Sequence, residues 1–381
     1  MTITPNSPTL AAVVRRFPLL GRPRPSCPSL PERVQQVADS ARAAGHDSAD
    51  RLTEGAHALN KAALIASDCG LPDLARELCW QHVDLYRVLD RPLTVLHARY
   101  MLEPVINLVR LQLRAHNGDE ALRLLTEVFR AVRSGTDLIV EERTLPLTEL
   151  TGDSDERKKL HEWVWLHLIG DGVRALALAG RWDDAVTHAQ THRGIGLHLM
   201  EGRQAAIMAH LVRGNLSGAQ AALEESTPQH PWEIQVASCL KVMCTDPDSS
   251  PAPRDVAAMI TRFGEHQPVS GYAFFRAQLG LCVATLADIA DREAASRVLA
   301  QVADEAIESG DGYGAREVLR HHDIHAVITE GRYAALTDLL TASGLGTGAI
   351  PEPLRRDLLG STRLAAAELS ASLRQLTQPA I

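Results

Sequence analysis

A short turn pattern occurs twice near the middle of the 381-residue chain. Gly180 precedes Ala185 by five residues and Gly214 precedes Ala219 by five residues, so the two copies lie 34 residues apart. Glycine ends a helix readily because it adopts the left-handed backbone conformation, and a small residue lets the next helix cross the first closely. A period of 34 residues is typical of stacked helical hairpins. The pattern therefore predicts an all-α fold, a right-handed α-solenoid of helical hairpins.

Less regular copies of this turn occur on both sides of the matched pair. Each has a turn residue followed, five positions later, by a residue at the place where the second helix would cross the first. The turn residues and their followers are Gly70 with Ala75, His116 with Ala121, Ala290 with Ala295, and Gly331 with Leu336. The intervals between these turns are unequal, so we expect irregular repeats with inserted or degenerate hairpins.

Composition divides the chain into a short N-terminal stretch and a long helical region. Residues 1–30 hold six prolines and little periodicity, which predicts a flexible Pro-rich arm. Helical periodicity then predicts a helical-repeat solenoid over residues 31–350 and a C-terminal capping helix and tail over residues 351–381. A polar loop at residues 144–154 is a candidate break between two lobes. We find no sustained alternation of apolar and polar residues, so we expect no β-strand.

The segment covering about residues 160–226 resembles two consecutive tetratricopeptide repeats. A large residue, Trp182 or Leu216, stands two positions after each turn glycine, and Ala185 or Ala219 occupies the small crossing position. The segment departs from the family in its first helix, where the usual aromatic and small pair is weak, and it lacks the closing proline. More broadly, the chain is similar to the degenerate helical-repeat proteins common in actinobacteria, many of which are regulators or pathway accessories. The resemblance implies a tetratricopeptide-like fold that binds another protein or a peptide.

Charge and composition argue against several classes of function. The formal net charge of −8 disfavours a general electrostatic grip on nucleic acid or on an anionic membrane. No apolar run approaches the roughly 20 residues that span a bilayer. The early apolar run at residues 10–14 is followed rather than preceded by arginines, unlike a secretory signal. Six cysteines show no CxxC or metal-finger spacing. We therefore expect a cytoplasmic protein with no membrane contact and no direct nucleic-acid binding.

The first helix of each hairpin would line a concave face of such a solenoid. Counting back thirteen, ten, six, three or two residues from a turn selects positions that face inward. The candidate partner-binding residues chosen in this way are His57, Asn60, Asp68, His167, Arg174, Glu201, Gln204, Met208, His321 and His325. Polar groups mixed with apolar patches suit an extended peptide, whose amides need hydrogen bonds and whose side chains need pockets. The alternative is that these residues form a solvated inner wall that binds nothing.

Two pairs of histidines have a spacing that lets both rings reach one zinc ion from a helix. They are His321 with His325 and His188 with His192, each four residues apart. Catalytic zinc needs a third protein ligand and an activating carboxylate, and no glutamate follows the first histidine of either pair. We therefore expect no metal site, and hydrogen-bonding histidines on a solvent-facing helix are the simpler interpretation.

Other signatures of catalysis are weak. The glycine-rich stretches at residues 310–314 and 344–348 follow no predicted strand and carry no Walker lysine, so they read as turns between helices. No Gly-x-Ser-x-Gly elbow occurs. We therefore assign no catalytic residue and expect no cofactor.

The first functional hypothesis is a non-catalytic scaffold or adaptor that binds a protein or peptide partner on its concave face. The alternative is an accessory enzyme or substrate-presenting component of a bacterial biosynthetic pathway, which would require His57, His167, Glu201 and His321 to converge. A third hypothesis is a regulator without a DNA-binding domain, because neither end shows a helix-turn-helix signature. The sequence does not choose the partner or the oligomeric state.

Overall fold

The computed structural model describes residues 8–45, 50–245, 253–321 and 324–375. Within these residues the protein is all-α, with eighteen helices and one pair of short strands. The chain divides into two compact units. Unit 1 comprises Met1–Pro28 and Gly172–Ser343, and unit 2 comprises Ser29–Asp171 and Gly344–Ile381. The division falls inside helix α7 (Ser154–Leu178) rather than at the polar loop of residues 144–154.

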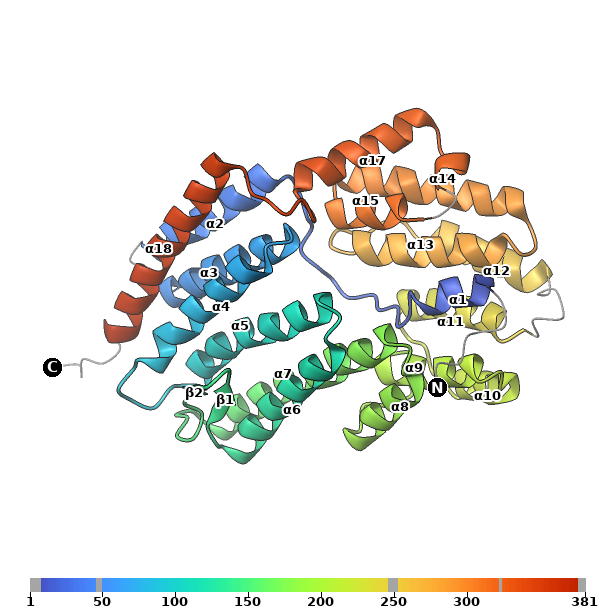
Figure 1. Ribbon diagram of the computed structural model, residues 1–381. Coiled ribbons are helices and arrows are strands. Elements are labelled where there is room, and N and C mark those ends of the chain that lie inside the picture. The colour runs from blue at the N-terminus through green and yellow to red at the C-terminus, as the bar shows by residue number, and fades with distance from the viewer. Residues whose placement is uncertain (1–7, 46–49, 246–252, 322–323, 376–381) are drawn as a thin grey trace. The chain divides into compact units, whose positions relative to one another are not determined.

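Unit 2 consists of helical hairpins and a helix from the C-terminal end of the chain (Figure 1). Its helices are α2 (Leu30–Ala44), α3 (Arg51–Asp68), α4 (Pro72–Arg87), α5 (Val95–Arg114), α6 (Gly118–Ser134), the first part of α7, and α18 (Glu352–Gln375). The C-terminal helix α18 packs against α2 and α3. Its buried side chains recur at helical spacing, and they are Leu358, Ala365, Leu369 and Leu373. The helix expected in residues 351–381 thus covers the first hairpin of unit 2.

A two-stranded hairpin follows α6 in unit 2. Strands β1 (Leu138–Val140) and β2 (Arg143–Leu145) are antiparallel, and both residues of the connecting turn, Glu141 and Glu142, have positive φ. This conformation matches the twist of a tight hairpin. The expectation of no strand was wrong, because three-residue strands are too short to show an alternating pattern.

Unit 1 contains the remaining helices (Figure 1). They are α1 (Pro8–Val14), the end of α7, α8 (Trp182–Thr191), α9 (Glu201–Val212), α10 (Leu216–Glu224), α11 (Pro231–Met243), α12 (Pro253–Glu265), α13 (Ala273–Ala287), α14 (Arg292–Ser309), α15 (Gly312–Leu319), α16 (Ile324–Val327) and α17 (Glu330–Ser343). Helix α13 packs against α11, α12, α14 and α15, so it lies at the centre of this group. Helix α1 also packs on α13.

Four of the predicted hairpin turns share one backbone geometry. The turn residues Gly70, His116, Gly180 and Gly214 have φ values of 80°, 60°, 71° and 73°. The residue after each turn residue donates its N–H to the carbonyl five residues back, at 2.9 Å in every case. This pairing satisfies carbonyls that a helix end leaves without partners. The alanines five positions after these turns are buried, and they are Ala75, Ala121, Ala185 and Ala219. The turn rule is confirmed at these four places.

The same rule misplaces one turn and misses another. Gly331 lies inside α17, so it ends no helix. Gly310 instead takes the left-handed conformation (φ 62°) at the end of α14, and Ala315, five residues later, is fully buried. The Gly310–Ala315 pair therefore fits the rule that was applied to Gly331.

The first residues described also differ from expectation. Residues 1–7 lie outside the described part of the chain, but Val13, Phe17, Leu19 and Cys27 are at most 4% exposed. A flexible arm would leave these side chains in water. The stretch instead packs within unit 1, because it carries apolar side chains between its prolines.

Candidate functional site

Gln204 on α9 binds the backbone of the N-terminal segment, which we define as residues 17–28. The Leu19 N–H donates to Gln204 Oε1 at 2.7 Å, and Gln204 Nε2 donates to the Leu19 carbonyl at 2.7 Å. The same nitrogen donates to the Leu199 carbonyl at 2.6 Å. Gln204 is fully buried, so these bonds form away from water. The side-chain amide thus pairs with an extended chain as a neighbouring strand would.

Glu201 lies one helical turn before Gln204 and holds Arg22 of the same segment. Arg22 Nη1 lies 2.8 Å from Glu201 Oε1, and Nη2 donates to Oε2 at 3.1 Å. Two parallel bonds between a guanidinium and a carboxylate fix orientation as well as charge. The Glu201 side chain is 3% exposed and that of Arg22 is 45% exposed. The half-exposed guanidinium therefore neutralises the charge of a buried carboxylate.

The segment continues along other elements of unit 1. The Arg24 N–H donates to the Gly271 carbonyl at 2.8 Å, and the Gly312 N–H donates to the Cys27 carbonyl at 2.8 Å. The Arg24 guanidinium carbon lies 3.6 Å from the centre of the Tyr313 ring, within the range of a cation–π contact. The face of unit 1 that includes Glu201 and Gln204, here called the α9 face, is therefore covered by the chain itself.

Met208, the third candidate on α9, is fully buried and offers no surface to a partner. The histidine candidates of unit 1 are also separated. His321 follows the end of α15, is 7% exposed and lies 3.4 Å from Thr285 Oγ1. His325 belongs to α16, is exposed, and its ring centre lies 4.1 Å from that of Tyr333. The prediction that His321 and His325 share one helix face was wrong, because α15 ends at Leu319 and His325 lies on a separate helix, α16.

His188 and His192 do lie together, with ring centres 4.9 Å apart, at the end of α8. No group of three or more histidine, cysteine, aspartate or glutamate side chains in the described residues is arranged to hold a metal ion. The arrangement of this pair is an edge-to-face contact between two rings.

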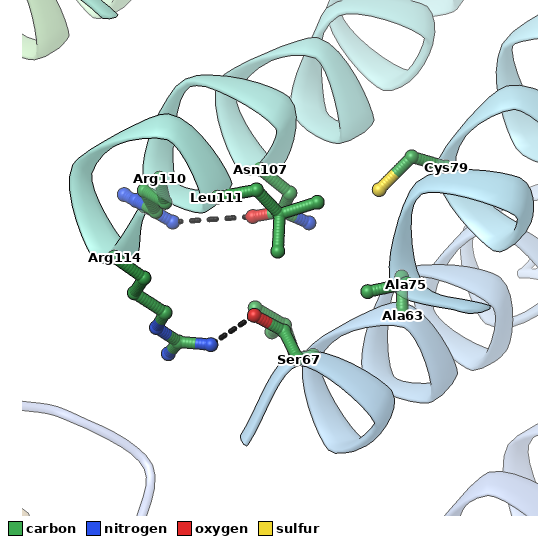
Figure 2. Close-up of a pocket in the computed structure, with 9 residues that line it drawn as sticks. Ala63, Ser67, Ala75, Cys79, Asn107, Arg110, Leu111 and Arg114 are labelled. Atoms are coloured by element: carbon green, nitrogen blue, oxygen red, sulfur yellow. Dashed lines mark hydrogen bonds between the residues drawn. The ribbon is translucent and has the colours of Figure 1, made fainter. Parts of the chain in front are cut away.

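In unit 2, polar side chains of α3 contact those of α5. Asn107 Nδ2 donates to Asn60 Oδ1 at 2.5 Å. Asp68, 6% exposed, accepts a hydrogen bond from Arg33 on α2 and another from Arg114 Nη2 at 2.8 Å. Arg114 also donates to the hydroxyl of Ser67 (Figure 2). The α3 candidates Asn60 and Asp68 thus bind the neighbouring hairpin.

The end of α5 also contacts α7. Arg110 Nη2 lies 3.7 Å from Asp171 Oδ2, and His167 Nδ1 lies 3.1 Å from the same oxygen. Candidate His57 is exposed on α3, with its ring edge-on to Tyr100. Candidate Arg174 is exposed on α7. We call the surface formed by Asn60, Ser67, Asp68, Asn107, Arg110 and Arg114 the α3–α5 face.

A shallow pocket opens on the α3–α5 face (Figure 2). Its walls are apolar, while polar and charged side chains of α5 stand at its rim. Its lining residues are Ala63, Leu64, Ser67, Ala75, Cys79, Asn107, Arg110, Leu111 and Arg114. Its empty volume of about 240 Å³ includes space open to solvent. The cavity volume proper is about 10 Å³, roughly the room needed by one water molecule, so the pocket is a shallow depression in the face.

Sequence reasoning missed the residues that α5 contributes. Arg110 and Arg114 lie six and two residues before the turn at His116, the same offsets that selected Asp68 and Arg174 elsewhere. The offsets were not applied at this turn because it lacks a leading glycine. The positive φ of His116 shows that a non-glycine residue serves as well there, which is a conformation that histidine adopts more readily than bulkier residues.

The residues required by the enzyme hypothesis are divided between the units. His57 and His167 belong to unit 2, while Glu201 and His321 belong to unit 1, so neither unit holds all four. Glu201 is already bound to Arg22. Among the described helices, none is both long and apolar enough to cross a membrane.

No protein-family model matches the chain, and no curated protein and no solved structure is significantly similar to it.

Proposed function

We propose that the protein is a non-catalytic scaffold or adaptor that binds an extended peptide segment of a partner protein on a polar face of its helical hairpins. The observation that carries the proposal is the contact of Gln204 with both backbone groups of Leu19. A residue chosen from the repeat pattern as a peptide contact does bind an extended chain. The hydrogen bonds involve the backbone, so the same position can accept segments of different sequence.

The proposal includes a tetratricopeptide-like, right-handed solenoid as the arrangement of the hairpins. Four turns, each with a residue of positive φ and a buried alanine five positions later, support a common hairpin design. Stacked hairpins of this kind present an extended surface to partners. A cytoplasmic location is also part of the proposal.

In unit 2, the α3–α5 face is where a partner segment would bind. The Arg110 and Arg114 side chains are 42% and 43% exposed, so each can contact a ligand carboxylate or carbonyl without first leaving the protein interior. Asn107 supplies a side-chain amide beside the pocket. The exposed guanidinium groups would bind the backbone carbonyls or carboxylates of an extended peptide that lies across the shallow depression.

The experiment is selection of binding peptides from a displayed library of random 12-residue sequences, using the full chain as bait. We expect enriched peptides whose affinity for the Arg110→Glu variant falls about tenfold or more, because a hydrogen-bonding cation is replaced by a repelling anion.

Arg130→Glu is the matched control, because Arg130 is exposed on α6 and does not line the pocket. It makes the same change in charge away from the α3–α5 face. Failure to enrich any peptide, or equal losses of affinity in both variants, would contradict the proposed site.

A further inference from the structure

The N-terminal segment contacts unit 1 through its backbone at three separated positions. Leu19 pairs with Gln204 on α9, Arg24 donates to Gly271 before α13, and Cys27 accepts from Gly312 at the start of α15. Residues 18–29 form no helix. The partners come from three different parts of unit 1, so they form a track for an extended chain rather than a local turn.

Side-chain contacts along the track select a particular chemistry. Glu201 holds Arg22 by two bonds, and the rings of Tyr313 and Phe274 lie 3.6 and 4.8 Å from the Arg24 guanidinium carbon. The buried carboxylate and the aromatic pair each favour a cation. The track therefore favours two arginines separated by one residue.

The residue before the first arginine is also constrained. A β-carbon on Gly21 would lie 2.3 Å from Cγ of Trp232, closer than any real side-chain contact. A side chain at this position would require Trp232 to move. The sequence Gly21-Arg22-Pro23-Arg24 thus meets three separate requirements of the surface.

The connection of the segment to the rest of unit 1 is long. Ser29–Asp171 of unit 2 separates it in sequence from Gly172, where unit 1 resumes. A break between Pro28 and Ser29 would leave every other part of unit 1 covalently intact. The segment is therefore joined to the rest of unit 1 only through the chain of unit 2, as a ligand on a long tether would be.

We propose that residues 17–28 are a tethered peptide ligand, and that the track they occupy in unit 1 recognises extended segments of the pattern Gly-Arg-x-Arg in a partner protein. This inference rests on the proposed function and adds a specific ligand class. A partner segment binds by exchange with residues 17–28, whose tether gives them a high effective concentration. Partner binding at this track is consequently competitive with the chain's own N-terminus.

The test uses the full chain with a protease recognition sequence inserted between Pro28 and Ser29. After cleavage, residues 1–28 are held by non-covalent contacts alone. A fluorescein-labelled synthetic peptide of residues 8–28 is then added, and its uptake is followed by fluorescence anisotropy. We expect saturable uptake by the cleaved protein and little uptake by the uncleaved protein, because the tethered copy competes in the latter.

Peptide variants test the chemistry of the track. Arg22→Ala and Arg24→Ala peptides should each bind about tenfold or more weakly, since each loses a contact to a buried carboxylate or to an aromatic pair. The Arg15→Ala peptide is the matched control, because Arg15 is exposed. Glu201→Gln in the protein should reduce binding of the native peptide but not of the Arg22→Ala peptide.

Several outcomes would overturn the inference. They are unfolding of unit 1 on cleavage, failure of the labelled peptide to exchange before the whole unit unfolds in urea, and equal affinity of the native, Arg22→Ala and Arg24→Ala peptides. Any of them would make residues 17–28 a structural part of unit 1. None would affect the library selection at the α3–α5 face, so failure here is distinct from failure of the proposed function.

Discussion

Units 1 and 2 both have a side-chain amide at the same position relative to a hairpin turn, but the two amides have different hydrogen-bond partners. Gln204 lies ten residues before the turn at Gly214, and Asn60 lies ten residues before the turn at Gly70. Gln204 binds the backbone of the N-terminal segment, whereas Asn60 binds Asn107 on the next hairpin. An amide at this position needs a partner wherever it is buried. The comparison indicates that the same position can serve either ligand binding or packing between hairpins.

The largest expected effect concerns one ion pair in each unit. The side chains of Arg33 and Asp68 in unit 2 are 9% and 2% exposed, whereas the side chain of Arg22, which pairs with Glu201 in unit 1, is 45% exposed. Asp68→Asn should lower the free energy of unfolding of unit 2 by about 3 kcal/mol or more, because it removes the carboxylate that neutralises a buried arginine. Urea unfolding followed by amide hydrogen exchange would assign the loss to unit 2.

Asp39→Asn is the matched control for this change. Asp39 contacts Arg42 on the same helix, and both side chains are about 60% exposed. Water screens an exposed pair of this kind, so Asp39→Asn should lower stability far less than Asp68→Asn. Equal losses of stability from Asp68→Asn and Asp39→Asn would show that burial does not distinguish the two pairs.

A somewhat smaller effect should follow Gln204→Leu in unit 1. The variant leaves the Leu19 N–H and two backbone carbonyls without their partner in a buried place. We expect a loss of about 2–3 kcal/mol, with faster hydrogen exchange in α9 and in the N-terminal segment. Asn60→Leu in unit 2 should cost about 1 kcal/mol, because it removes only the acceptor of Asn107 Nδ2, while Asn107 Oδ1 still accepts from Arg110 Nη1. A larger loss of stability in Asn60→Leu than in Gln204→Leu would contradict the conclusion that the two amides have different roles.

Acid should destabilise unit 2 gradually. Burial lowers the pKa of His82 to about 3 and that of His97 to about 4. The unfolded chain takes up these protons below about pH 6.5, while the folded chain stays neutral there. Stability is therefore fully present above that pH and decreases as the pH falls towards 4, by up to about 1.4 kcal/mol per pH unit for each group.

His82→Leu should reduce this acid sensitivity. Neither ring nitrogen of His82 has a hydrogen-bond partner among the described residues, so the substitution removes no hydrogen bond. Urea midpoints at pH 7 and pH 4.5, measured with hydrogen exchange, would report the change in unit 2. His325→Gln replaces an exposed imidazole and should leave the difference between the two midpoints unaltered. An unchanged pH dependence in His82→Leu would exclude this buried imidazole as the source.

Short-range features of this molecule were predictable from sequence. The turns at Gly70, Gly180 and Gly214 depend on one glycine and one alanine five residues later, so a local pattern contains the information. The helix expected within residues 351–381 is α18 (Glu352–Gln375). In each case the determining contacts lie within a single hairpin or helix.

Contacts between distant parts of the sequence were not predictable. Leu19 and Gln204 are 185 residues apart, and nothing periodic in a proline-rich stretch indicates such a pairing. Arg51 of α3 and Glu368 of α18 are 317 residues apart, and their ion pair depends on how the ends of unit 2 meet. Glu201 and Gln204 both contact the N-terminal segment from one helix, and this segment could not be inferred from the sequence as their partner.

The packing of α18 on α2 and α3 has a consequence for synthesis of the chain. The apolar surface of α2 and α3 that receives Leu358, Ala365, Leu369 and Leu373 is synthesised well before α18, the helix that covers it. At about 5–20 residues per second, translation from the end of α3 to the end of α18 takes on the order of tens of seconds. During this time the nascent first hairpin exposes apolar surface, which makes it a candidate for chaperone binding on the ribosome. Completion of unit 2 therefore waits for the synthesis of α18.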